Sequence, residues 1–416
     1  MLPRFLVFIL IFLLIVGVEF YFYQAVKTVI RDYSSTKKQW INYVYWASAI
    51  FTISVALVSI FIPPPEWNKF FRNYFASLAF ILFFVKIIGV VFLLIDDGIR
   101  LIRFIWRYFF ETGKQDAKEG ISRLKFLSYI SLSLAAIPFV SLIYGMFRGA
   151  FKYTVHKVSI KSSKIPRAFH GLKIVQVSDI HTGSFTDTSA LEKAFDIVMK
   201  QGADVIFFTG DLVNNRTEET AGFVPVYQKL KAPMGVYSIL GNHDYGDYVQ
   251  WDSPEAKQQN LEDLKKVHAE SGWKLMMNEH VALEKKGEKI ALLGIENWGG
   301  NLRFPKYGKM KEAHKGTEEY PFKILLSHDP SHWDKQVLKE YSDVDLTLSG
   351  HTHGMQFGVE IPGFKWSPVK YFYPNWAGLY QQGEQYLYVN RGLGFLGYPG
   401  RVGIWPEITV IELLSS

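Results

Sequence analysis

Hydrophobic and polar positions divide the chain into two regions with different patterns. Before residue 150, apolar residues form four long runs, each near the length of about 20 residues that a helix needs to cross a bilayer. These runs cover residues 5–23, 43–62, 74–95 and 126–147. After residue 150 the apolar runs are short and alternate with segments of helical spacing, which is typical of a globular domain. We therefore expect a four-span transmembrane region over residues 1–150 and a globular domain over residues 151–416.

The short runs of the second region predict strands that alternate with helices. Strands are expected at residues 173–178, 204–209, 235–240, 274–277, 281–284, 290–295, 322–326, 344–348, 386–390 and 407–413, and helices at 189–201, 254–271 and near 332–341. Continuous apolar strands between helices indicate sheets that are covered on both faces. Ligands of such sheets bind beyond the carboxyl ends of the strands, so polar motifs at those ends are the first candidates for a site.

Composition and charge narrow the class of protein. Hydrophobic residues make up 49% of the chain and aromatic residues 16%, and the excess lies before residue 150, as a membrane region requires. The chain has no cysteine, which excludes disulfides and thiolate metal sites. The formal net charge of +7 is explained by lysines and arginines that flank the membrane spans. Because the charge of the globular region is mixed, we expect no nucleic-acid partner.

The loops between the spans differ in their basic residues, and this difference predicts an orientation. The first loop carries four Lys or Arg residues and the third carries seven, whereas the second carries two. By the positive-inside rule the first and third loops are cytoplasmic, which places both termini outside. The basic stretch 148–167 argues for the opposite orientation, but a large domain can be translocated despite its charge. We therefore expect the globular domain on the outer, periplasmic or extracellular, side of the plasma or inner membrane.

Three features of the sequence each admit two interpretations. Lys86 lies near the middle of the third span. It is either a functional group or a residue without a functional role. We favour the second interpretation, in which Lys86 is paired with a neighbouring helix or the span boundary is shifted. Arg100, Arg103 and Arg107 form either the basic face of an interfacial helix or the end of a span that extends past the bilayer. The aromatic stretch 364–380 forms either a rim that contacts the bilayer or an acyl chain, or a hydrophobic loop packed on a sheet.

Five polar motifs of one chemical kind follow predicted strands. They are Asp179-Ile180-His181, Gly210-Asp211, Gly241-Asn242-His243-Asp244, Ser327-His328-Asp329 and Gly350-His351-Thr352-His353. Their carboxylate, imidazole and amide groups form a nitrogen and oxygen ligand set that suits Mn, Fe, Zn, Ni or Co. A carboxylate such as Asp211 can bridge two cations, and two cations about 4 Å apart clamp the attacking and leaving oxygens of a displacement at phosphorus. Single residues of these types are often turn formers or caps, but five such motifs in one chain argue for a metal site.

These motifs, in this order, resemble those of the calcineurin-like metallophosphoesterase superfamily over roughly residues 151–416. Further resemblance to its branch of membrane-attached bacterial phosphoesterases comes from Val177-Ser178-Asp179-Ile180-His181, residues 350–356 and Val389-Asn390-Arg391-Gly392-Leu393-Gly394. That branch usually has glycine where Met355 stands, which affects the shape of the substrate rim and not the metal ligands. The resemblance implies an α+β protein in which a helical transmembrane bundle of four spans precedes a four-layer α/β/β/α sandwich.

The resemblance also implies a role for each motif residue. One divalent metal ion would be held by Asp179, His181, Asp211 and His353, and a second by Asp211, Asn242, His328 and His351. A hydroxide between the two ions would be the nucleophile. His243 would contact the phosphoryl oxygen and protonate or stabilise the leaving group, and Asp244 would orient the imidazole of His243. Arg391 and Arg401 are either phosphate ligands or partners in structural salt bridges.

We therefore expect an integral membrane phosphoesterase whose partners are the lipid bilayer and a phosphate-ester substrate. The branch that the chain resembles acts on phosphodiester and pyrophosphate bonds, which favours lipid-linked or envelope substrates. A phosphomonoesterase, including a protein phosphatase, is the enzymatic alternative. A metal-binding membrane sensor or a transporter is the alternative from a different class, although the spans hold few ionisable groups and lack an interrupted helix pair of the transporter kind.

Overall fold

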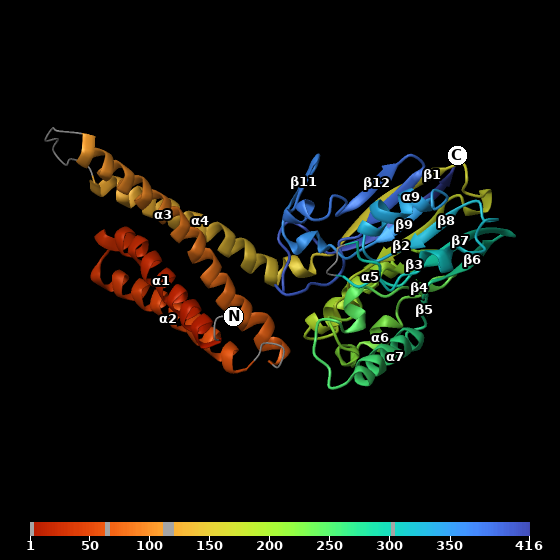
Figure 1. Cartoon of the computed structure of the whole chain (residues 1–416), viewed down its shortest axis with the longest axis horizontal. Helices are drawn as coiled ribbons and strands as arrows, with labels where there is room; N and C mark the ends of the chain where they lie inside the picture. Colours follow the sequence, from red (N-terminus) through yellow and green to blue (C-terminus); the bar gives the residue numbers. More distant parts are fainter. Residues whose placement is uncertain (1–3, 63–66, 111–119, 301–303) are drawn as a thin grey trace. The chain divides into compact units, whose positions relative to one another are not determined.

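The computed structural model describes residues 4–62, 67–110, 120–300 and 304–416. The chain divides into two compact units, Met1–Tyr144 and Gly145–Ser416. The first unit consists of long helices, and the second contains two β-sheets with helices around them (Figure 1).

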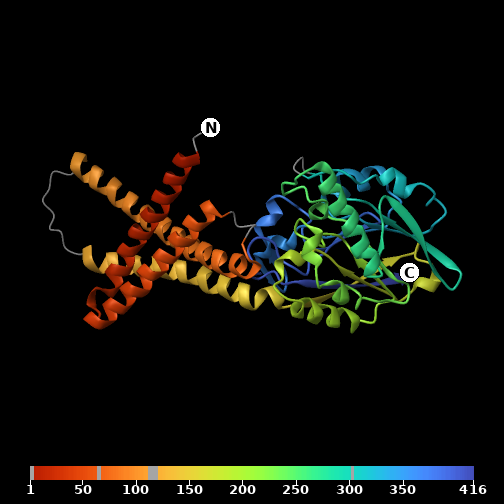
Figure 2. The same cartoon turned by 90° about the horizontal axis from the view of Figure 1, so that it is seen from below.

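Four long helices account for the first unit and the start of the second. They are α1 (Arg4–Val29), α2 (Ser35–Phe61), α3 (Ser77–Phe110) and α4 (Gly120–Phe147). In the described part of the chain, four helical segments are long and apolar enough to cross a membrane, and each overlaps one of the four predicted spans. α1 packs against both α2 and α3 (Figure 2).

The three arginines after the third predicted span lie on the last turns of α3, which continues unbroken to Phe110. A helix of 34 residues is about 51 Å long, whereas the hydrocarbon core of a bilayer is about 30 Å thick. Arg100 pairs with Asp96 one turn earlier at 2.5 Å, and neighbouring side chains such as Phe104 are exposed. This segment is therefore a helix end extended beyond the length of a span; Lys114 and Lys118 of the same loop lie outside the described residues.

Lys86 is buried within the first unit and forms an ion pair with Glu19 of α1. Its Nζ lies 2.9 Å and 2.8 Å from the two carboxylate oxygens of Glu19 and 3.1 Å from Oγ of Ser48 on α2. Tyr45, also on α2, donates its hydroxyl to the carbonyl oxygen of Glu19 at 2.6 Å. The interpretation of Lys86 as a lysine paired with a neighbouring helix is thus confirmed, and the pair links three helices.

Two six-stranded sheets form the centre of the second unit. The first contains, in spatial order, β1 (Thr154–Ser162), β14 (Glu407–Ser415), β2 (Leu172–Val177), β3 (Val205–Phe208), β4 (Val236–Ser238) and β5 (Lys274–Leu275). The second contains β12 (Gly378–Gln382), β13 (Gln385–Val389), β9 (Leu346–Ser349), β8 (Lys323–Leu326), β7 (Glu288–Gly294) and β6 (Glu279–Lys285). β2 to β5 are parallel to one another, as are β13, β9, β8 and β7. The carboxyl ends of these strands therefore meet at one edge of each sheet.

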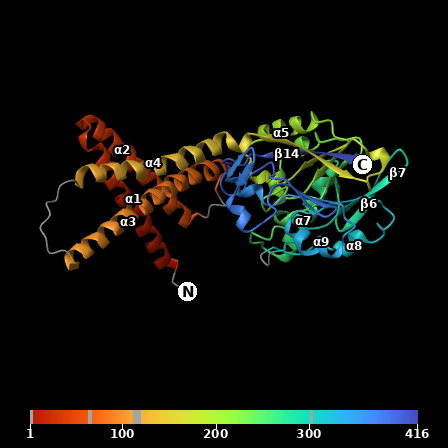
Figure 3. The same cartoon turned by 90° about the horizontal axis from the view of Figure 1, so that it is seen from above.

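The two sheets pack face to face, and helices cover both outer faces. Buried apolar side chains of both sheets, such as Phe207 and Leu326, belong to one cluster. The covering helices are α5 (Ser189–Met199), α6 (Val224–Tyr227) and α7 (Pro254–Glu270) on the first sheet, and α8 (Met310–His314) and α9 (Leu338–Glu340) on the second. Figure 3 shows α5 and α8 on opposite sides of the sheets. The expected four-layer α/β/β/α sandwich is confirmed.

Four strands in the described part of the chain were not predicted. β1 pairs with β14 at the other end of the domain sequence, and β12 pairs with β13 as an antiparallel hairpin. β10 (Val359–Ile361) and β11 (Phe364–Trp366) form a separate two-stranded hairpin. The aromatic stretch 364–380 thus begins in β11, passes through a helical turn at Pro368–Tyr371 and ends in β12, so it is not a loop along its whole length.

Candidate metal centre

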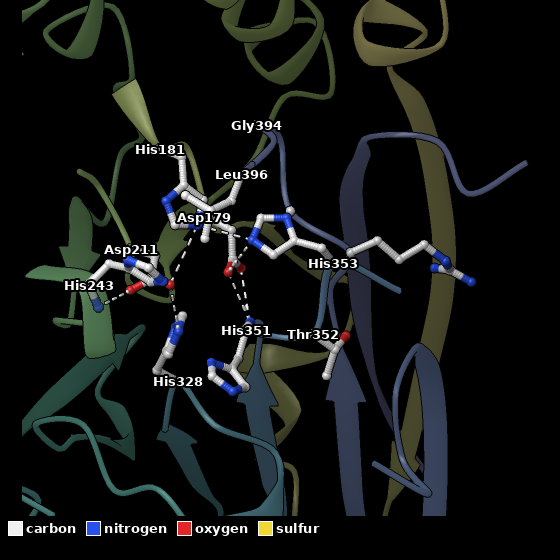
Figure 4. Close-up of polar contacts among 12 residues, drawn as sticks. Asp179, His181, Asp211, His243, His328, His351, Thr352, His353, Gly394 and Leu396 are labelled. Carbon is white, nitrogen blue, oxygen red and sulfur yellow. Dashed lines mark hydrogen bonds and ion pairs between the residues drawn. The ribbon is translucent and has the colours of Figure 1, made fainter. Parts of the chain in front are cut away.

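Five loops at the carboxyl ends of strands bring the motif residues together (Figure 4). Those after β2, β3, β4, β8 and β9 carry, in turn, Asp179 and His181, Asp211, Asn242 and His243, His328, and His351 and His353. The side chains of His243 and His351 are partly buried, and the others are buried. Buried strands precede these loops, and apolar residues such as those of the fully apolar β3 (Val205–Phe208) anchor the loops in the core. The predicted site residues therefore lie in one place.

Left-handed backbone conformations occur at five residues of the site. The φ angles are 50° at Asp179, 50° at His181, 59° at Asp211, 72° at His351 and 50° at His353. Such conformations cost residues with a Cβ atom of order 1–3 kcal/mol each and persist only where the surrounding structure holds them. Gly350 is needed at the turn before His351, because a Cβ there would lie 2.2 Å from Oδ2 of Asp179. The resulting sharp turns direct the motif side chains toward one another.

The first cluster of ligand atoms comes from the loops after β2 and β9. Nε2 of His353 lies 3.0 Å from Nε2 of His181 and 3.3 Å from Oδ1 of Asp179. One ligand atom from each of these three residues lies within 4.8 Å of the others. Oδ2 of Asp211 is 3.5 Å from Nε2 of His181. These four residues are the set that the family resemblance assigns to one metal ion.

The second cluster shares Asp211 with the first. Oδ2 of Asp211 lies 3.1 Å from Nε2 of His328, and ligand atoms of Asp211, His328 and His351 lie within 4.8 Å of one another. Nδ1 of His351 lies 2.7 Å from Oδ1 of Asn242. His351 is also tied to the first cluster, since its backbone N–H donates to both carboxylate oxygens of Asp179 at 3.0 Å. The two clusters thus form a continuous site with Asp211 in both.

The electrostatics of the site favour ionised carboxylates beside two neutral imidazoles, those of His181 and His351, and one protonated imidazole, that of His328. Burial would raise the pKa of Asp211, but the imidazoles of His328 and His243 hold this pKa well below its usual range. Burial would lower the pKa of His328, yet the Asp211 carboxylate raises it to about 10. Burial lowers the pKa of His181 to about 3 and also lowers the pKa of His351. Neutral imidazoles and ionised carboxylates are the protonation states that metal ligands require, and a cation would displace the proton that His328 otherwise binds.

Two buried ring nitrogens test whether the site fits metal ions. Nδ1 of His181 is buried and forms no hydrogen bond with any described residue, and Nε2 of His328 is buried 3.1 Å from Oδ2 of Asp211. The other ring nitrogen of His328, Nδ1, lies 2.7 Å from the carbonyl oxygen of Thr209, which orients the ring as metal-binding histidines usually are. Imidazole nitrogens with carboxylate and amide oxygens suit divalent Mn, Fe, Zn, Ni or Co. The residues present therefore fit such cations.

The structure corrects the expected role of Asp244. Its buried carboxylate accepts hydrogen bonds of 2.8–3.2 Å from the backbone N–H groups of Asp211, Leu212, Val213 and Gly241. The imidazole of His243 instead donates from Nδ1 to the carbonyl oxygen of Asn214 at 2.7 Å. The expectation was wrong because a short helical turn at Asn242–Tyr245 points the carboxylate into the loop, where free N–H groups converge. Asp244 joins the loop after β3 to the loop after β4.

Three residues that touch the site were not predicted as site residues. The hydroxyl of Tyr373 lies 2.8 Å from Nε2 of His351, and the hydroxyl of Tyr248 accepts from Nδ2 of Asn242 at 2.9 Å. Oδ2 of Asp329 lies 3.7 Å from Nε2 of His351. The two tyrosines lie on loops whose paths no sequence pattern reveals, whereas the position of Asp329 directly after a motif histidine was a usable signal.

Arg391 and Arg401, for which two roles were expected, are both buried. Arg391 pairs with Glu407 and, at 2.6 Å, with Glu360, so the salt-bridge interpretation is confirmed for Arg391. Arg401 has no exposed surface and donates to the carbonyl oxygen of Arg391 at 2.8 Å. Its Nη2 also lies 3.2 Å from Nδ1 of His353. Arg401 therefore matches neither expectation and supports the backbone behind His353.

Met355 has the backbone that a glycine would adopt without strain. Its φ angle is 54°, in the left-handed region that glycine populates freely. The side chain of Met355 is 50% exposed. The methionine therefore adds an exposed apolar group two residues after His353.

Family models match both regions of the chain. Residues 3–150 match the model described as "Probable Calcineurin-like phosphoesterase, transmembrane domain". Residues 172–355 match the model described as "Calcineurin-like phosphoesterase". Together with the four membrane-length helices, the first match makes this an integral membrane protein.

Several curated proteins are similar to this chain. A transmembrane protein with metallophosphoesterase domain from Danio rerio is 32% identical over 67% of this chain, which spans only 62% of that protein. The uncharacterized metallophosphoesterase YkuE of Bacillus subtilis is 33% identical over 62% of this chain and 84% of its own length.

Two further relatives have named activities. The UDP-2,3-diacylglucosamine pyrophosphatase LpxG of Chlamydia muridarum is 27% identical over 64% of this chain and 91% of its own length. The phosphodiesterase YaeI of Escherichia coli is 26% identical over 71% of this chain and 100% of its own length. From its motifs, its sandwich and these similarities, the chain belongs to the calcineurin-like phosphoesterase family and is a membrane-bound metallophosphoesterase.

Proposed function

We propose that this enzyme hydrolyses phosphodiester or pyrophosphate bonds of lipid or envelope substrates at a centre of two divalent cations. The observation that carries the proposal is the shared position of Asp211, whose Oδ2 lies 3.1 Å from Nε2 of His328 and 3.5 Å from Nε2 of His181. One cation would be held by Asp179, His181, Asp211 and His353, and the other by Asp211, Asn242, His328 and His351. When bound, the cations would lower the pKa of water toward neutrality, so that hydroxide is available, and would offset charge on the phosphoryl oxygens.

His243 is the residue that we assign to the leaving group. Its backbone N–H donates to Oδ1 of Asp211 at 2.8 Å, and its Nδ1 donates to the carbonyl oxygen of Asn214 at 2.7 Å. These two bonds fix the ring and leave Nε2 for a phosphoryl or leaving-group oxygen. The ring of His243 is 5.0 Å from that of His181, which places it beside the first cluster. Proton transfer by such a group contributes typically about 10²–10⁴-fold to a rate.

A cavity beside the second cluster offers room for the body of a substrate. Its volume is about 800 Å³, and its lining includes Ser331, Asp334, Tyr373, Asn375 and Tyr380. Tyr373 also reaches Nε2 of His351, so the cavity adjoins the metal centre. An aromatic wall with amide and carboxylate groups suits a polar group attached to the phosphate, which a diester or pyrophosphate has on both sides of the scissile bond.

The membrane and the relatives favour lipid or envelope substrates. A hydrolase domain that follows four spans meets such substrates at high local concentration. The names of LpxG and YaeI attribute pyrophosphatase and phosphodiesterase activities to those two relatives. The basic first and third loops support a catalytic domain on the outer side of the membrane. A reporter enzyme fused after Ser416 tests the side, and activity inside the cell would reverse our orientation.

Turnover of chromogenic esters tests the proposed reaction. The purified full chain with added Mn should hydrolyse bis-p-nitrophenyl phosphate faster than p-nitrophenyl phosphate. Asp211→Asn removes the shared carboxylate and should lower bound Mn and the rate together. Asp343→Asn is the matched control, because it makes the same change at an exposed carboxylate outside the site. Asp343 precedes β9, whereas His351 follows β9 at its other end.

The outcomes separate the candidate functions. Diester turnover that falls in Asp211→Asn and persists in Asp343→Asn supports the proposal. Faster turnover of the monoester would replace it with a phosphomonoesterase. Bound Mn without turnover of either ester would favour a metal-binding membrane sensor.

A further inference from the structure

An exposed apolar surface follows the metal ligands in the sequence. Six large exposed apolar side chains lie within residues 357–372 and are called here the apolar rim: Phe357, Val359, Ile361, Phe364, Tyr371 and Phe372. Their exposed fractions range from 42% to 72%. Scattered exposed apolar residues are normal, but a group of this size on one segment marks an interaction surface.

The β10–β11 hairpin turns its apolar face away from the domain. It pairs Val359 with Trp366, Glu360 with Lys365 and Ile361 with Phe364. Paired residues point to the same face and successive pairs alternate, so the two apolar pairs share one face. On the opposite face, Glu360 reaches the buried Arg391 at 2.6 Å. That ion pair holds the polar face against the domain and leaves the apolar face outward.

The apolar rim is connected to the end of the fourth candidate span, Lys125–Phe151. The N–H of Arg401 donates to the carbonyl oxygen of Gly145 in the last turn of α4 at 3.1 Å. The contact is close enough that a Cβ on Gly145 would lie 2.7 Å from Cγ2 of Val402. Val402 in turn forms a β-bridge with Phe357, the first residue of the rim.

Basic side chains occur in the rim segment and just after α4. Nζ of Lys370 lies 5.4 Å from the ring of Tyr371, and Nζ of Lys152 lies 4.5 Å from the ring of Trp405. Arg148, just after α4, is exposed. Aromatic rings beside lysine and arginine are the composition of a membrane interface, and the cations complement anionic lipid headgroups.

The same segment is bonded to the metal ligands. The hydroxyl of Tyr373, directly after the rim residue Phe372, lies 2.8 Å from Nε2 of His351. Oγ of Ser367 donates to the carbonyl oxygen of Gly354 at 2.7 Å. The segment that carries the apolar rim is therefore hydrogen-bonded to the loop where phosphate would be hydrolysed.

We propose that the apolar rim inserts into the leaflet at which α4 ends and receives the acyl chains of a lipid substrate. The rim would let the enzyme hydrolyse the phosphodiester or pyrophosphate of a membrane amphiphile without releasing that lipid into water. Charge at Lys370, Lys152 and Arg148 selects anionic headgroups. The substrate class, an anionic lipid with its phosphoester near the interface, rests on the proposed function; insertion of the rim does not.

Site-specific labels test insertion directly, because the chain has no cysteine to remove. Ile361→Cys and, as control, Lys289→Cys are made in the full chain, labelled with an environment-sensitive fluorophore and placed in phosphatidylglycerol nanodiscs. Lys289 is an exposed residue on β7. The label at residue 361 should shift to the blue and be quenched by nitroxide-bearing lipids, whereas the label at residue 289 should show neither effect. A water-like spectrum of the label at residue 361 would overturn the proposal. A disulfide-linked dimer through Cys at residue 361 would also overturn it, because a second copy of the chain would then cover the apolar rim.

A pair of diesters tests delivery of the lipid. The substrates are p-nitrophenyl hexadecyl phosphate in nanodiscs and water-soluble bis-p-nitrophenyl phosphate. The double variant Ile361→Asp/Phe364→Ser should lower the ratio of kcat/KM for the first over the second by about tenfold, the effect of losing one buried apolar side chain. An unchanged ratio overturns the proposed role in lipid delivery. If the wild type hydrolyses neither diester while the label at residue 361 is quenched, insertion stands and the proposed reaction fails.

Discussion

The buried ion pair of Arg391 with Glu407 offers a sharp test of how the second unit is held together. Glu407 has no exposed surface, and Arg391 is 2% exposed. Glu407 also accepts a hydrogen bond from the hydroxyl of Tyr388 at 2.6 Å, and Arg391 also pairs with Glu360 of β10. The substitution Arg391→Met keeps much of the side-chain volume but removes the charge, so it leaves Glu407 as a buried carboxylate without its cation.

The structure gives an approximate size for this effect. Breaking a buried pair by removing one partner costs about 3–5 kcal/mol. Since 1 kcal/mol shifts the melting temperature by about 2–4 °C in domains of about 150–250 residues, Arg391→Met should lower it by about 6–20 °C at pH 8. The double variant Arg391→Met/Glu407→Gln should recover most of the loss, because the unpaired charge is gone. Thermal unfolding of the full chain in detergent, followed by tryptophan fluorescence, measures both.

The dependence on pH separates loss of the charge from loss of packing. Burial raises the pKa of Glu407, but Arg391 lowers it more, so the pKa lies below the usual 4.5. In the wild type this group's contribution to stability is therefore present above pH 4.5 and is lost as pH falls through the folded-state pKa. In Arg391→Met the largest cause that lowers the pKa of Glu407 is gone, although the hydroxyls of Tyr388 and Thr409 still lower it. Burial should then raise this pKa, so that the folded state binds a proton more tightly than the unfolded state. The deficit of the variant should shrink as pH falls from about 8 to about 5.

A surface pair supplies the control for this experiment. Lys289→Met breaks an exposed ion pair with Glu284, 3.4 Å long. Exposed pairs contribute about 0–1 kcal/mol, so this variant should melt within about 4 °C of the wild type. The reasoning is refuted if Arg391→Met melts as close to the wild type as this control, or if the double variant melts below Arg391→Met.

Three further perturbations test other parts of the molecule. His243→Ala should lower kcat on the diester by about 10²–10⁴-fold while bound Mn, measured by elemental analysis, stays at the wild-type level; a parallel loss of Mn would contradict its assigned role. Burial lowers the pKa of His268 to about 3. The contribution of neutral His268 to folding stability is therefore complete above about pH 6.5 and should fall by about 2 kcal/mol at pH 5. From pH 7 to pH 5 the melting temperature should drop less in His268→Phe than in the wild type, and an equal drop would contradict this prediction. Lys86→Met leaves the buried Glu19 unpaired and should reduce the monodisperse fraction in size-exclusion chromatography, whereas Lys86→Met/Glu19→Gln should restore it.

Local sequence pattern was sufficient for the elements that lead into the site. Runs such as Val205–Phe208 are buried on both faces of a parallel sheet, so they are continuously apolar and easy to recognise. The polar motifs that follow them mark where each strand ends, and the parallel arrangement then brings those ends to one edge. This is why the candidate metal ligands that the structure gathers could be named from the sequence.

Elements that depend on distant partners could not be found in the same way. β1 alternates exposed lysines with buried positions and forms only against β14, near the other end of the chain. The β10–β11 hairpin did have a local signal, the turn-forming dipeptide Pro362-Gly363. For Tyr373 and Asp244, the contacts lie with residues of other loops, so only the folded chain reveals them.

The corrected position of Asp244 explains how the site tolerates its backbone. The left-handed conformation of Asp211 is unfavourable by itself. The carboxylate of Asp244 stabilises it, because this carboxylate accepts hydrogen bonds from the N–H groups of Asp211 and the two residues after it, and from that of Gly241. Asp179 acts similarly when its carboxylate accepts the N–H of His351, another left-handed residue. In both cases a carboxylate holds the turn that aims a ligand. The carboxylate of Asp179 therefore lies in the first ligand cluster and also holds a loop, whereas the carboxylate of Asp244 only holds a loop.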